Sequence, residues 1–120
     1  SEATSGLSHL AKLAAVAVRY VLLAYSERDA DKAYAVWKND VQLDEAYTGY
    51  FRQLLTYMME DPRNITPCTH LLFMAKNIER IGDHATNIAE SIWYQVHGEP
   101  LVKQRKKRDE TASPDLSGPL

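Results

Sequence analysis

The first 61 residues contain no proline, and this feature constrains the fold more than any other. The five prolines are at positions 62, 67, 100, 114 and 119, and glycine is sparse before the first of them. Proline removes a backbone donor and glycine costs backbone entropy, so both residues interrupt helices. The chain before Pro62 is therefore predicted to form long helices.

Apolar residues recur at helical spacing in two stretches of this segment. The first stretch runs from about Ser5 to Ser26, and Asp29 is a suitable N-cap for the second, which ends near Glu60 before Pro62. The expected core positions are Leu7, Leu10, Ala14, Ala17, Val18, Val21 and Tyr25, followed by Ala33, Val36, Trp37, Leu43, Tyr47, Phe51, Leu54 and Met58.

A third helix is predicted between Thr66, as N-cap with Pro67 in the first turn, and Gly98. Short connections force neighbouring long helices to run antiparallel. The sequence thus predicts an all-α fold, an antiparallel up-down-up three-helix bundle. The expected core stripe of the third helix is Leu71, Met74, Ile78, Ile81, Ala85, Ile88 and Ile92.

Composition divides the chain into a single domain at residues 1–98 and a polar, basic tail at 99–120 that is expected to be disordered. The basic run Lys103–Arg108 is most simply a solvated tail, and contact with an anionic membrane surface or an acidic partner is the alternative. A net charge of −2 argues against nucleic acid as a partner.

The location of the protein is predicted from its cysteine and its apolar segments. Cys68 is the only cysteine, which fits a reducing compartment and hence the cytoplasm. The most apolar stretch, Leu10 to Tyr25, contains Lys12 and Arg19 and is shorter than the roughly 20 residues of a membrane span. We expect neither a signal peptide nor an anchor.

The first helix is apolar on nearly every side, because Val16, Tyr20 and Leu23 lie opposite its core stripe. Such a helix needs a second packing partner, either another bundle or a second copy of the chain. The alternative interpretation is that small residues such as Ala11 and Ala15 merely dilute the pattern.

Two aspartates interrupt the apolar stripe of the second helix. Asp40 lies almost at its centre and Asp44 follows one turn later. Burying a carboxylate without a partner costs several kcal/mol, so the surroundings must supply a cation, a donor or a metal. Arg19, Arg80 and Lys76 are the candidate organic partners, and with them these aspartates would belong to a purely structural helical module.

The third helix repeats the pattern with Glu79 and Asp83, and Asn87 comes next in line. Acidic pairs on antiparallel helices can converge, and clustered carboxylate oxygens favour hard or borderline metal cations. These positions lie beside the apolar stripe, so any bound metal would be partly exposed.

A carboxylate-bridged metal-dependent enzyme is the sharpest catalytic alternative, but such bundles use Glu-x-x-His, and the chain contains no such motif. His84 projects about 100° away from Asp83 on the helix. No nucleophile and base are paired in the sequence, so the protein is not expected to be an enzyme.

The segment 76–90, KNIERIGDHATNIAE, followed by Tyr94 and Gly98, strongly resembles the third helix of a PhoU three-helix unit, and the run 39–47 resembles the acidic motif of the preceding helix. The resemblance implies a PhoU-like, spectrin-repeat-like bundle over about residues 5–99. It implies metal ligation by four residues, with iron, zinc, manganese or magnesium as the cofactor. These residues are Asp40, Asp44, Glu79 and Asp83, with Asn87 and Glu90 as weaker candidates.

The same resemblance implies a non-enzymatic negative regulator of bacterial phosphate uptake and phosphate-starvation signalling. Its expected partners are the phosphate-transporter ATPase and the phosphate-sensing histidine kinase, at the inner face of the cell membrane, and Arg80 and His84 are candidate partner-binding residues. Members of the family carry two units in tandem, whereas this chain has one, which looks like the C-terminal half. Self-association or packing on a second unit is therefore expected.

Overall fold

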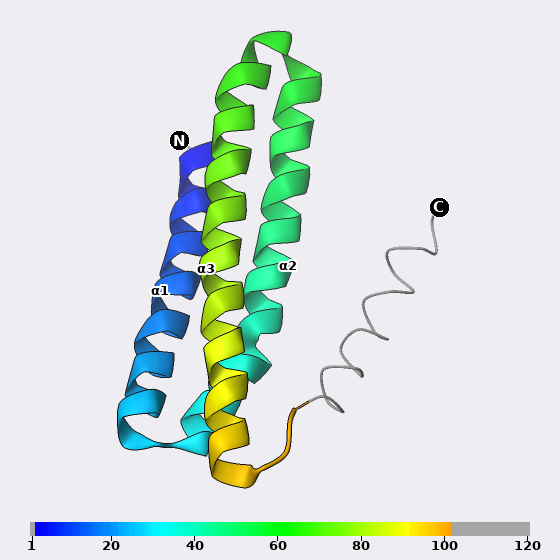
Figure 1. The fold of residues 1–120 in the computed structure, drawn as a ribbon. Coiled ribbons are helices and arrows are strands. Elements are labelled where there is room, and N and C mark those ends of the chain that lie inside the picture. The colour runs from blue at the N-terminus through cyan, green and yellow to red at the C-terminus, as the bar shows by residue number, and fades with distance from the viewer. Residues whose placement is uncertain (1, 102–120) are drawn as a thin grey trace.

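The computed structural model describes residues 2–101, which form three long helices and one short 3-10 turn (Figure 1). The elements are α1 (Glu2–Glu27), α2 (Ala30–Glu60), η1 (Pro62–Asn64) and α3 (Ile65–His97). Figure 1 shows α1 and α3 running in one direction and α2 in the other, and each helix contacts both of the others. The predicted all-α, up-down-up three-helix bundle is confirmed.

A two-residue connection joins α1 to α2. Arg28 adopts a left-handed conformation with φ of 51°, and the amide of Asp29 donates to the carbonyl of Ala24 at 2.9 Å, which ends α1. The Asp29 carboxylate accepts a hydrogen bond from the backbone amide of Lys32 at 3.0 Å. Asp29 is therefore the N-cap of α2, as predicted.

The connection between α2 and α3 differs from the prediction. Asp61 caps η1 by accepting from the amide of Arg63, with Pro62 in the first turn, and α3 begins at Ile65 rather than after Thr66. Asn64 donates its side-chain amide to the carbonyl of Tyr57 at 3.0 Å, which holds the turn against the end of α2. The prediction of Thr66 as N-cap was wrong because the 3-10 turn starts the helix earlier.

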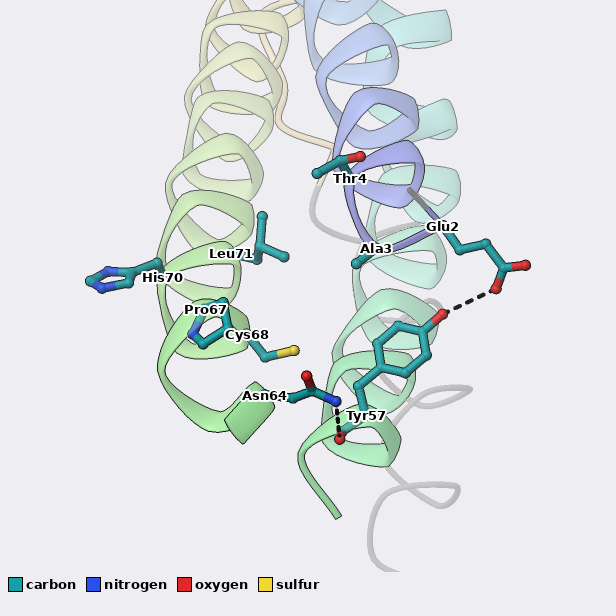
Figure 2. Close-up of a pocket in the computed structure, with 9 residues that line it drawn as sticks. All are labelled: Glu2, Ala3, Thr4, Tyr57, Asn64, Pro67, Cys68, His70 and Leu71. Carbon is teal, nitrogen blue, oxygen red and sulfur yellow. Dashed lines mark hydrogen bonds between the residues drawn. The ribbon is translucent and has the colours of Figure 1, made fainter. Parts of the chain in front are cut away.

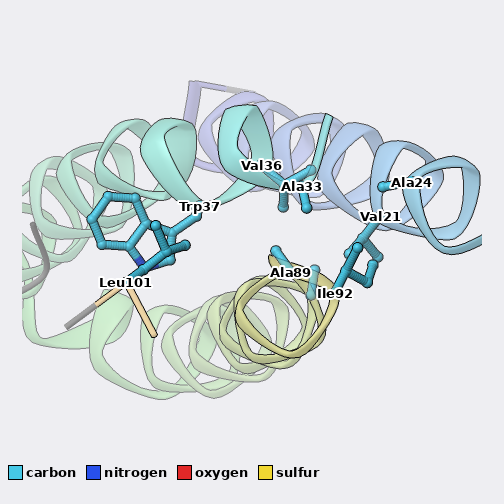
Figure 3. Close-up of a cluster of buried hydrophobic side chains, with 9 residues drawn as sticks. Val21, Ala24, Ala33, Val36, Trp37, Ala89, Ile92 and Leu101 are labelled. Carbon is cyan, nitrogen blue, oxygen red and sulfur yellow. The ribbon is translucent and has the colours of Figure 1, made fainter. Parts of the chain in front are cut away.

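The core consists of two buried clusters along the bundle. One lies toward the end of the bundle where α1 meets α2, and Figure 3 shows part of it. The other lies nearer the α2–α3 connection. Their buried members are Val21, Ala24, Ala33, Val36, Trp37, Ala85, Ala89, Ile92 and Leu101, and then Leu10, Ala14, Leu43, Tyr50, Leu54, Cys68 and Ala75.

The buried face of α3 matches the predicted stripe only in part, since Ala85 and Ile92 are buried as expected. Met74, Ile81 and Ile88 are 49%, 47% and 43% exposed, whereas small residues including Ala75 and Gly82 face the core. Small side chains let helix axes approach closely, and the large residues are then left on the flank. The expected core positions at 74, 81 and 88 were wrong for this reason.

The surface of α1 retains the apolar residues expected on its second face, because Val16, Tyr20 and Leu23 are all exposed. By length and composition alone, α1 is long and apolar enough to cross a membrane, although the expected apolar stretch was shorter. The core helix of a bundle passes the same test, and Leu10 and Val21 are buried against α2 and α3.

The chain turns back after α3 instead of continuing away from the bundle. Gly98 ends α3 with φ of 73°, and Leu101 is buried at 6% exposure in the same cluster as Trp37. Figure 3 shows Leu101 beside the Trp37 ring. The packed segment thus extends three residues past the expected domain boundary at 98, and the predicted disordered basic tail lies, from residue 102 onward, outside the described residues.

Candidate metal centre

Three aspartates from two helices converge on one face of the bundle. Asp40 and Asp44 come from α2 and Asp83 comes from α3, and one carboxylate oxygen of each lies within 4.8 Å of the others. Asp40 is buried, Asp44 is half-buried and Asp83 is exposed. We call these three residues the aspartate cluster. Its solvent exposure increases from Asp40 through Asp44 to Asp83.

The local sequence explains why the carboxylates meet. Asp40 and Asp44 stand one turn apart and therefore project from the same side of α2. Opposite them, Gly82 precedes Asp83 and has no side chain, so the backbone of α3 approaches α2 closely. A β-carbon on Gly82 would lie 3.9 Å from Asp40 Oδ1 and 2.1 Å from Leu43 Cδ2. The glycine thus places Asp83 within reach of Asp40.

Glu79, the fourth residue expected in the site, lies outside the aspartate cluster. Its carboxylate accepts a hydrogen bond from Lys76 Nζ at 2.8 Å, and its side chain is 13% exposed. The same hydrogen bond raises the pKa of Lys76, which favours the charged form of this side chain. Lys76 is thus paired within α3 itself.

The weaker candidates have separate positions. Glu90 accepts a hydrogen bond from Trp37 Nε1 at 3.1 Å, which links α3 to α2, and Asn87 is exposed. Arg80 and His84, expected to bind partners, are both exposed, and Arg80 donates to Asn77 at 3.5 Å. Arg80 and His84 are therefore accessible to another molecule.

The donor set of the aspartate cluster suits a hard divalent cation. Carboxylate oxygens are the ligands that such ions prefer, and close carboxylates repel one another until a cation neutralises them. Because Asp83 and part of Asp44 face solvent, water molecules can complete the coordination of an ion bound there. Among the residues from 2 to 101, no histidine or cysteine belongs to the cluster.

A second concave site lies at the end of the bundle where α2 meets α3, and it was not expected from the sequence. It is an open pocket of about 650 Å³ between the start of α1, the end of α2 and the start of α3 (Figure 2). Tyr57 donates to Glu2 at 3.2 Å across its mouth. Figure 2 shows Cys68 pointing inward and His70 pointing away from it, so the two do not form a nucleophile–base pair.

Comparison with known proteins gives consistent matches. The model of the PhoU domain family matches residues 7–92. A phosphate-specific transport system accessory protein PhoU homolog from Xylella fastidiosa is 57% identical over 94% of this chain and 48% of that relative. A protein of the same name from Rhizobium meliloti is 58% identical over 90% of this chain and 46% of its own length.

A solved structure agrees with these matches. The crystal structure of PhoU from Pseudomonas aeruginosa superimposes with a TM-score of 0.75 at 40% identity, covering 77% of this chain and 44% of that one. The chain spans about half the length of the curated relatives that it matches.

Proposed function

This chain belongs to the PhoU family, and we propose that it acts as a regulatory accessory unit of bacterial phosphate uptake and phosphate-starvation signalling. The observation that carries the proposal is the 57% identity, over 94% of the chain, to a phosphate-specific transport system accessory protein. The word accessory in that name supports a regulatory rather than a catalytic role. The chain spans only 48% of that relative, so what the longer protein does is proposed for this chain and does not follow from the match alone.

The proposal includes a metal ion at the aspartate cluster. Asp40, Asp44 and Asp83 supply three oxygen ligands, and Glu79 is available as a fourth if it leaves Lys76. Manganese, magnesium, iron or zinc is the ion, and neutralising the mutual repulsion of the aspartates is the effect expected on the protein. The metal then fixes the spacing of α2 and α3 on that face.

The proposed partners are the transporter ATPase and the phosphate-sensing kinase, in the cytoplasm at the inner face of the membrane. Arg80 and His84 are exposed on α3 and are available to them. The exposed apolar residues of α1, including Val16 and Tyr20, support packing on a second PhoU unit or a second copy.

The regulatory role is tested in a bacterium whose own PhoU protein is deleted and whose phosphate-starvation genes drive a reporter. Two forms are expressed in this strain: the chain alone, and the chain fused to the part of a relative that it does not match. Restored repression in high phosphate by either form supports the proposal. Persistent reporter activity with both forms, at normal protein levels, contradicts it.

Metal binding is tested by elemental analysis after dialysis against Mn²⁺, Fe²⁺ or Zn²⁺. Asp40→Asn is compared with Glu45→Gln, because Glu45 is the next acid along α2 after Asp44 and is exposed outside the aspartate cluster. We expect the wild type and Glu45→Gln to retain metal and Asp40→Asn to lose it. Equal retention by all three proteins would place the metal elsewhere, and no retention by any would support a structural role for the aspartates.

A further inference from the structure

The contact between α1 and α3 is bordered by an exposed surface, and a pocket lies at each of its ends. At one end, Tyr25 of α1 and Gln95 of α3 help to line a pocket of about 400 Å³. At the other end, the pocket in Figure 2 lies between the starts of the two helices and has Thr4 and His70 in its lining. We call the surface between these two ends the α1–α3 face.

The α1–α3 face carries no charged residue along either helix. Alternating steps of four and three residues stay on one side of a helix, and they lead from Thr4 to Tyr25 on α1 and from His70 to Gln95 on α3. All of these 15 positions except Val18 are exposed, and none is Asp, Glu, Lys or Arg. At the 25% charged residues of the whole chain, about four would be expected. A helix side that only meets water has no need to exclude charge.

The two sides of the α1–α3 face differ in side-chain size. The α1 side contains small residues, among them Ala11 and Ala15, whereas on α3 the large residues Met74, Ile81 and Ile88 are 49%, 47% and 43% exposed. Small side chains let another helix approach closely, and large ones pack between the side chains of that helix. A lipid surface instead needs large apolar side chains that project into it from the whole face. The face therefore suits a helix better than a membrane.

Exposed cations border the α1–α3 face. Lys12 and Arg19 stand two turns apart on α1, each directly after a position of the face, and Arg80 directly precedes Ile81 on α3. Arg28 lines the pocket at one end. Among the ion pairs within residues 2–101, none joins these four cations to an acid. They are therefore available to acids of another molecule.

The acids of α1 and α3 lie away from this border. Those of α1 are its terminal residues, Glu2 and Glu27. On α3, Asp83 belongs to the aspartate cluster with two residues of α2, Glu79 stands one turn before it on the same side, and Glu90 accepts from the indole on α2. The border of the α1–α3 face is thus basic along both helices. A second copy docked through the same face would bring cations against cations, so a complementary partner is acidic at its border.

We propose that the α1–α3 face binds an amphipathic helix of a partner protein whose apolar stripe is flanked by Asp and Glu. The stripe packs on the uncharged positions, and the flanking acids meet Lys12, Arg19 and Arg80. The face spans 22 residues of α1 from Thr4 to Tyr25, which is about 33 Å or six turns of a partner helix. This inference deepens the proposed function and rests on it only for the partner being part of the phosphate system.

The test titrates the purified chain into a fluorescein-labelled synthetic helix of about 22 residues and follows its fluorescence anisotropy. The peptide has Leu at the a and d positions of each heptad and Glu at the flanking e and g positions, and a matched peptide has Lys in place of every Glu. We expect the Glu peptide to bind at least about tenfold more tightly than the Lys peptide at low salt. The difference should shrink at 1 M salt, which screens charges at the border.

Substitutions on and off the face locate the binding. Ile81→Glu places a charge on it, and Leu55→Glu is the matched control, because Leu55 is a 40% exposed apolar residue of α2. We expect Ile81→Glu to weaken binding of the Glu peptide at least about tenfold and Leu55→Glu to match the wild type. Ala15→Glu is a second variant on the face, and circular dichroism verifies that each variant is folded. Lys12→Gln/Arg19→Gln should reduce the preference for Glu over Lys to about threefold or less.

Equal affinity for the two peptides, or equal loss in Ile81→Glu and Leu55→Glu, would overturn the proposal. A wild-type dimer that Ile81→Glu dissociates in sedimentation would assign the face to a second copy. Binding to phosphatidylglycerol vesicles that Ile81→Glu abolishes, without a preference between the peptides, would assign it to a lipid surface. Loss of peptide binding on fusion to the unmatched part of a relative would assign it to that part. The reporter assay of the proposed function uses no peptide, so its failure and the failure of this docking are distinguishable.

Discussion

The α-carbon of Gly82 on α3 faces the side chain of Leu43 on α2 so closely that a β-carbon there would lie 2.1 Å from Leu43 Cδ2. Real β-carbons do not approach other atoms this closely, so only glycine permits the observed packing. The same contact sets the distance between the helices at the level of Asp40 and Asp83. Core packing and the candidate metal site are therefore coupled through one residue.

Gly82→Ala is expected to force α2 and α3 apart and to destabilise the fold by about 1–3 kcal/mol, the usual cost of an overpacked core. It should also weaken Mn²⁺ binding. Gly49→Ala is the matched control, because nothing lies within 4 Å of its β-carbon position and alanine favours a helix by about 0.5–1 kcal/mol. Urea unfolding measures the stability of the two variants, and an equal change in both would contradict the packing argument.

Arg28→Gly is expected to stabilise the protein. Arg28 holds a left-handed conformation, with φ of 51°, at the C-terminus of α1, and this conformation costs a residue with a β-carbon about 1–2 kcal/mol. Glycine relieves that cost but adds backbone freedom to the unfolded chain, so we expect a net gain of about 0.5–1 kcal/mol by thermal or urea unfolding. Arg28→Ala keeps the β-carbon and should show no such gain.

The sequence predicts the helices well because their ends carry chemical signals. Asp29 before α2, Pro62 after it and Gly98 after α3 each act locally, and the structure has helix ends at or next to these residues. The face of α3 was predicted less well, because apolar periodicity weights large residues such as Ile81 above small ones such as Gly82. Close packing of helices reverses that order.

The candidate site was predictable only where the signal is local to one helix. Asp40 and Asp44 stand out because they interrupt an apolar stripe on their own helix. Which acid of α3 faces them depends on how α3 is rotated and on Lys76, which pairs with Glu79. The burial of Leu101 had no local signal at all, since it depends on a contact with Trp37, distant in sequence.

Asp83→Asn and Glu79→Gln should therefore differ in metal binding. Asp83 belongs to the aspartate cluster, whereas Glu79 is paired with Lys76 outside it. We expect Asp83→Asn to weaken Mn²⁺ binding about tenfold or more, because it removes a charged ligand. A tenfold change corresponds to about 1.4 kcal/mol of binding free energy. Glu79→Gln should have a smaller effect. Calorimetric titration checks the order, and a larger loss in Glu79→Gln would show that Glu79 turns to the metal.

The N-cap of α2 predicts a dependence of stability on acid pH. Hydrogen bonds from the backbone amide and side chain of Lys32 lower the pKa of Asp29. A lowered folded-state pKa contributes stability above the unfolded value of about 3.9, and this contribution is lost as the pH falls through the folded value. Asp29→Asn should thus be less stable than the wild type at pH 7, and the gap should narrow at pH 3. A gap of constant size in urea unfolding would contradict the charge argument.

Tyr50 predicts the opposite dependence at alkaline pH. Its hydroxyl donates to the carbonyl of Ala3 and ties the start of α1 to α2, and burial raises the pKa of this phenol. Tyr50→Phe should cost about 1 kcal/mol at pH 7, because it leaves the Ala3 carbonyl without this donor. A raised folded-state pKa gives stability that is fully present below the unfolded value of about 10 and is lost as the pH rises through the folded value. The deficit of Tyr50→Phe in urea unfolding should therefore shrink between pH 9 and pH 11, and a deficit that grows there would show that the hydroxyl ionises in the folded state first.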